Sequence, residues 1–95
     1  MTGGWIDPFS YEISKERAQT LGRTGARLER TLASLRDCGP GEVARREALI
    51  WDATELVTAI IVQREACGLR NPSFVYEYYD VPREVIARIG VRRVA

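Results

Sequence analysis

Apolar and small residues recur every three or four positions through the first third of the chain. This series runs from Tyr11 through Leu21 and Leu28 to Leu35 without a slip, which is the spacing of one face of a helix. Asp7-Pro8 has the form of a helix start, because proline is favoured at the first helical position. A Gly-Pro-Gly stop follows at 39–41. The pattern therefore predicts a helix over 8–36.

A second long helix is predicted over 42–67, since no breaker interrupts this stretch and Gly68 is well placed just beyond its end. The apolar run 56–62 would also suit a buried strand, but good helix formers flank it on both sides. As a helix, this run is apolar on nearly every side. It must therefore be covered by more than the first helix: by the C-terminal segment or by a second copy of the chain.

Two short helices are expected at the C-terminus, over 72–79 and 82–89. Asn71-Pro72 favours a helix start, although the alternation of the four aromatics between 74 and 79 also fits a strand. We therefore predict an all-α fold, a long antiparallel helical hairpin plus two short helices. A single domain would span 1–95, with 1–7 as a flexible tail. The hairpin separates Cys38 from Cys67 by about 38 Å, too far for a disulfide.

Composition narrows the possible chemistry. The 95 residues carry 14 Lys+Arg and 13 Asp+Glu, a net charge of +1, so the broad positive field of non-specific nucleic-acid binders is missing. There is no histidine, which excludes Ser-His-Asp and Cys-His catalysis and any metal site that needs imidazole. The two cysteines lack metal-ligand spacing. We expect no cofactor, no metal and no catalytic residue.

The N-terminal residues show neither a basic nor an apolar region of a signal peptide, and the longest apolar run is far short of the ~20 residues that span a bilayer. A cytoplasmic protein without membrane contact is expected.

Self-association is expected for a chain this short, because folding buries only roughly 60–65% of its surface. Gly22 and Gly25 should each weaken the first helix by about 1 kcal/mol, and close approach of another helix would offset that cost. We therefore predict a homodimer, a four-helix-type bundle serving as a protein–protein interaction or assembly module. The predicted interface combines a small-residue strip on the first helix with apolar residues of the second: Ala18, Gly22, Ala26, Trp51, Leu56, Ile60 and Ile61.

A DNA-binding regulator is the first alternative, because segment 74–90 resembles a helix-turn-helix. Two positions depart from that motif: bulky Tyr76 stands where a small residue is usual, and Asp80 replaces the turn glycine. Acidic residues share the segment, whereas a major-groove reader carries more positive charge. Nucleic acid is therefore the less favoured partner; its contacts would be Arg83, Arg88, Arg92 and Arg93.

A small helical enzyme is the second alternative, with Arg17, Arg27 and Arg64 lining a pocket. No motif identifies such a pocket, and we expect no enzyme. A polar corner follows the apolar run, formed by Gln63, Arg64 and Arg70. It would bind an anion or a partner, or its arginines would simply stabilise the C-terminal end of the second helix through its dipole.

Three segments of the chain, taken together, carry a resemblance to a known family: 21–25 (Leu-Gly-Arg-Thr-Gly), 63–70 (Gln-Arg-Glu-Ala-Cys-Gly-Leu-Arg) and 82–85 (Pro-Arg-Glu-Val) with Gly90. With them the chain resembles a family of short, uncharacterised, all-helical bacterial proteins classed as a domain of unknown function. The resemblance implies a bacterial cytoplasmic protein. It brings no activity, cofactor or site residue.

Overall fold

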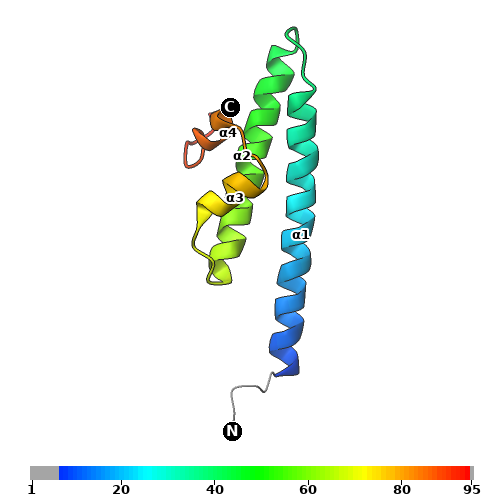
Figure 1. Cartoon of the computed structure of the whole chain (residues 1–95), viewed down its shortest axis with the longest axis vertical. Coiled ribbons are helices and arrows are strands. Elements are labelled where there is room, and N and C mark those ends of the chain that lie inside the picture. Colours follow the sequence, from blue (N-terminus) through cyan, green and yellow to red (C-terminus); the bar gives the residue numbers. More distant parts are fainter. Residues whose placement is uncertain (1–6, 95) are drawn as a thin grey trace.

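A computed structural model describes residues 7–94, and within them every regular element is a helix. The order is α1 (Pro8–Arg36), α2 (Val43–Ala66), α3 (Pro72–Tyr78) and α4 (Arg83–Ile86). Helices α1 and α2 form a long antiparallel hairpin, and the chain then returns along α2 (Figure 1). The all-α prediction is confirmed, and both strand alternatives are wrong. Of the predicted tail, residues 1–6 lie outside the described part.

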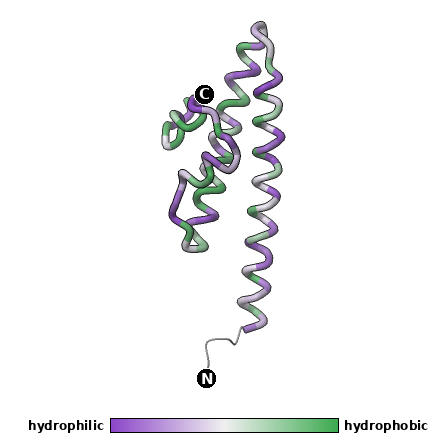
Figure 2. The backbone as a smooth tube through the Cα atoms, in the orientation of Figure 1, coloured by the Kyte–Doolittle hydropathy of each residue, from purple (hydrophilic) through white to green (hydrophobic). Residues whose placement is uncertain are grey.

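The core lies between the hairpin and the C-terminal segment. Helix α1 contributes leucines to this core, and α2 contributes apolar side chains from two of its faces. The C-terminal segment adds three valines that pack on α2. The central part of α2 is thus covered by α1 on one side and by α3 and α4 on the other (Figures 1 and 2). The buried hydrophobic residues are Leu28, Leu32, Leu35, Ile50, Ala53, Leu56, Val57, Ile60, Val75, Val81 and Val85.

Helix α1 extends well past the end of α2. The Gln63 side chain donates from Nε2 to Thr24 Oγ1 at 3.4 Å, and in an antiparallel pair this register places Ala66, the last residue of α2, opposite Leu21. Residues 8–20, which we call the N-terminal arm, lie beyond that point (Figure 1). At about 1.5 Å per residue the arm is about 20 Å long. All buried residues of α1 lie from Gly25 onward, so the arm has none.

The last helix is shorter than expected: 83–86 rather than 82–89. After Ile86 the backbone continues in tight turns, in which the amides of Arg88, Ile89 and Val91 each bond to the carbonyl three residues back. Gly90 ends this stretch with a φ of 81°. Hydrophobic spacing alone does not distinguish such turns from helix, because both bring residues three apart onto one side.

The two glycines of α1 have different surroundings. A Cβ at Gly25 would lie 2.3 Å from Tyr79 Oη, whereas a Cβ at Gly22 would meet nothing within 4 Å. Gly25 is thus closely approached, by a tyrosine side chain and not by the helix backbone that the sequence led us to expect. Within residues 7–94 nothing approaches Gly22, the middle residue of the expected strip Ala18, Gly22 and Ala26.

Candidate functional site

An open groove of about 800 Å³ lies at the junction of the N-terminal arm and the end of α2. The arm supplies Ile13, Ser14 and Ala18, and α2 supplies Gln63 and Ala66. Gln63 is fixed here by its bond to Thr24. Arg17, Leu21 and Cys67 are also among the lining residues. The groove is mainly apolar and forms because one helix stops while its partner continues.

The arm itself exposes large apolar side chains. Phe9 is 70% exposed and Tyr11 is 60% exposed, while Ile13 is half-buried at the groove. The charges of the arm balance, with two carboxylates and two basic groups: Glu12, Glu16, Lys15 and Arg17. A helix with exposed aromatics and no net charge is suited to contact with another protein surface.

The dimer interface predicted on α2 needs correction. Leu56 is 9% exposed and Ile60 is 1% exposed within one chain, so both belong to its own core. Ile61 packs partly against the same core. Trp51 is half-buried, and its ring is covered by the guanidinium groups of Arg88 and Arg93, at 4.9 and 5.9 Å from the ring centroid. The C-terminal segment covers this face of α2. This segment is the cover that the sequence predicts as the alternative to a second copy of the chain.

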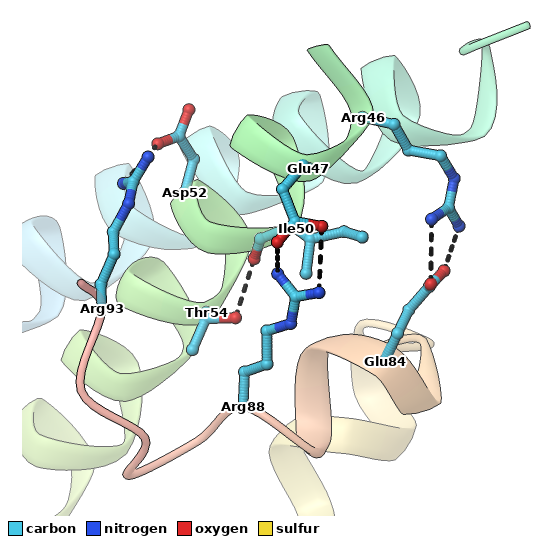
Figure 3. Close-up of polar contacts among 8 residues, drawn as sticks. All are labelled: Arg46, Glu47, Ile50, Asp52, Thr54, Glu84, Arg88 and Arg93. Atoms are coloured by element: carbon cyan, nitrogen blue, oxygen red, sulfur yellow. Dashed lines mark hydrogen bonds and ion pairs between the residues drawn. The ribbon is translucent and has the colours of Figure 1, made fainter. Parts of the chain in front are cut away.

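Ion pairs fasten the C-terminal segment to α2 (Figure 3). Arg46 bonds to both carboxylate oxygens of Glu84. Arg88 donates to both oxygens of Glu47, at 2.6 and 3.0 Å. These bonds from arginine lower the pKa of Glu47 and of Glu84, and the carboxylates in turn raise the pKa of both arginines. We call these two bidentate pairs the C-terminal clasp.

Arg93 extends this arrangement, since it lies 3.8 Å from Asp52 and 3.9 Å from Glu55. Two of the four candidate DNA contacts, Arg88 and Arg93, therefore face carboxylates of α2, while Arg83 and Arg92 are exposed. Asp80 has a φ of 51° in the turn between α3 and α4, as a turn glycine would. However, α4 has only four residues, whereas a recognition helix lies along the major groove and reaches several base edges. The geometry gives little support to DNA reading.

The arginines considered for an enzyme pocket do not come together. Arg17 lines the groove, and Arg64 does not. The Arg64 guanidinium lies 4.6 Å from the Phe74 ring centroid, and Arg27 is exposed. Of the polar corner, Arg64 and Arg70 line one shallow recess at the start of α3, whereas Gln63 points to Thr24.

An aromatic row on α3 links this corner to Gly25. Phe74 stacks on Tyr78 with ring centroids 5.7 Å apart, and Tyr78 meets Tyr79 edge-on at 4.9 Å. Burial raises the pKa of Tyr79, whose hydroxyl lies over Gly25. The stacking of Phe74 on Tyr78 follows from their spacing of four residues on a helix, which can be read from the sequence.

Both cysteines are free, as the hairpin predicted. Within residues 7–94, no three residues of the metal-binding types His, Cys, Asp and Glu are grouped so that they could hold a metal ion. None of the helices in that range is both long and apolar enough to cross a membrane.

Sequence reasoning missed the two features that matter most here. The N-terminal arm could have been found by aligning the predicted helices antiparallel from their shared turn, because α1 is longer than α2. The C-terminal clasp could not have been predicted from the sequence, because its partners are about 40 positions apart and many other charge pairings fit the same sequence equally well.

Comparison with protein families gives a match over most of the chain. A model described as "Family of unknown function (DUF6665)" matches residues 5–94. No curated protein and no solved structure matches the chain.

Proposed function

The chain belongs to the DUF6665 family, whose function is unknown, and we propose that it is a small assembly module that acts as a homodimer. The observation that carries this proposal is the N-terminal arm. Within residues 7–94, nearly half of α1 contains no buried residue, although the remainder is tightly packed.

An unpartnered arm is costly to leave in water. An isolated helix of about 13 residues is marginal even with a good sequence, so the arm depends on the packed part of α1 or on a partner. Phe9 and Tyr11 hold apolar surface in solvent, and burial would release about 25 cal/mol per Å² of that surface. Contact with a protein partner is therefore the role that the exposed arm supports best.

The centre of α2 offers no comparable contact surface. The central residues of α2 are already covered by α1 and the C-terminal segment. We therefore assign the dimer contact to the arm instead of α2. The free thiols of Cys38 and Cys67 agree with a reducing compartment, and we place the module in the cytoplasm.

Light scattering of the full chain over a roughly hundredfold dilution series tests the proposal, because a dimer must dissociate by mass action. We expect the mass of a dimer at high concentration. A monomer throughout the series overturns the proposal.

A matched pair of substitutions locates the contact. Ala18 on the arm and Ala33 near the turn are both exposed on α1, so the change to glutamate alters helix propensity equally at the two sites. Ala18→Glu places a charge in the groove and should yield a monomer. Ala33→Glu should leave the dimer intact, and the opposite pattern would move the interface away from the arm.

A further inference from the structure

We propose that the arms of two copies pair antiparallel, each filling the groove beside the other. This inference rests on the proposed homodimer and names its interface. Three observations support it: the continuity of the α1 seam, the fit of the arm to the vacant space, and the position of its tip.

The seam that α2 covers continues along the arm. Tyr11, Ser14 and Ala18 follow the same three-and-four spacing that places Leu28 and Leu35 under α2. Below the end of α2, these positions face the groove or solvent. A helix lying in line with α2, and antiparallel to α1, would cover them as α2 covers the rest.

A second arm has the length and direction that this space requires. The groove is lined on α1 by residues from Ile13 to Leu21, and the uncovered face of the arm continues from there to Pro8, so an arm about 20 Å long covers both. A two-fold axis across the arm makes the partner antiparallel automatically, as in any isologous interface. With the arms fully overlapped, the axis passes near Ser14. The balanced charge of the arm means that two copies do not repel each other.

The tip of the arm would meet the end of α2. In this pairing the first turn of one α1 reaches Ala66 and Cys67 of the other copy, which line the groove. The positive N-terminal end of one helix would face the negative C-terminal end of the other, an arrangement that helix dipoles favour.

The contact is small. Two arms of about 20 Å bury less than the standard ~1,600 Å² interface, so the dimer should form weakly and depend strongly on concentration. That property makes the test direct, because one sample can be followed as monomer and as dimer.

The reactivity of the two natural thiols tests the pairing. Cys67 is exposed and lines the groove, whereas Cys38 lies near the turn at the far end of the hairpin. With a maleimide probe, Cys67 should react at least about fivefold more slowly in concentrated than in dilute protein, and Cys38 should react equally in both. Ala18→Glu should abolish the difference at Cys67.

Crosslinking gives a second test, in a chain whose natural cysteines are replaced by serine. Ser14→Cys should form a disulfide-linked dimer under mild oxidation, because the two sites meet near the axis. Ala33→Cys, on the same helix, should not. A dimer in which Cys67 stays fully reactive and position 14 fails to crosslink overturns this pairing but leaves the homodimer standing. A monomer at every concentration overturns both.

Discussion

Replacing the two glycines of α1 by alanine should affect stability differently, with Gly22→Ala the more stable variant. Alanine gains about 1 kcal/mol of helix propensity over glycine at either site. At Gly22 a Cβ meets nothing within 4 Å, so Gly22→Ala should raise the free energy of unfolding by that amount. At Gly25 the Cβ would lie 2.3 Å from Tyr79 Oη and 3.2 Å from its Cζ, so the ring must move.

Overpacking of this kind costs about 1–3 kcal/mol. Because the propensity gain is common to both sites, the two variants should differ by that same 1–3 kcal/mol. Tyr78 packs against this ring edge-on, so a shift of Tyr79 also disturbs that contact. For a chain of this length, each 1 kcal/mol corresponds to about 4–8 °C in the melting temperature.

Urea and thermal melts followed by far-UV circular dichroism, at one protein concentration, measure the difference. Tyr79→Phe removes the nearest atom, so Gly25→Ala should cost less in that background than in the wild type. Equal stabilisation by both glycine substitutions would refute the packing of Tyr79 over Gly25.

Two further predictions concern the C-terminal segment. Val85 is fully buried and Val91 is 54% exposed. Val85→Ala should therefore lower the free energy of unfolding by about 2 kcal/mol, and Val91→Ala should barely change it. Equal losses of stability in urea melts would contradict the burial of α4. Because the bonds from Arg88 lower the pKa of Glu47 below its ordinary value of 4.5, the clasp contributes stability at neutral pH that is lost as the pH falls through that lowered pKa. Arg88→Met should therefore flatten the dependence of stability on pH below the ordinary pKa of glutamate, and unchanged slopes would show that the pair does not form.

Most of the fold could be predicted from the sequence, because its determinants are local. The spacing from Tyr11 to Leu35 and the breakers at 39–41 and Gly68 place both long helices within one or two residues. The end of α4 was misplaced, since the turns after Ile86 keep the same apolar spacing. The covering of Leu56 and Ile60 depends on where the C-terminal segment packs, which is a tertiary fact that periodicity leaves open.

The candidate site was less predictable for a related reason. Small residues at 18, 22 and 26 indicate where a helix can approach but not whether one does. The useful signal was the difference in length between the two helices, combined with their antiparallel direction.

Small-angle X-ray scattering tests the central claim, the pairing of the arms, most directly. Two chains joined through their arms extend in opposite directions, so the maximum dimension of the dimer should exceed that of the monomer by at least about 24 Å, the length of α1 over residues 21–36. A dimer no longer than the monomer, as side-by-side packing through α2 would produce, would contradict the account.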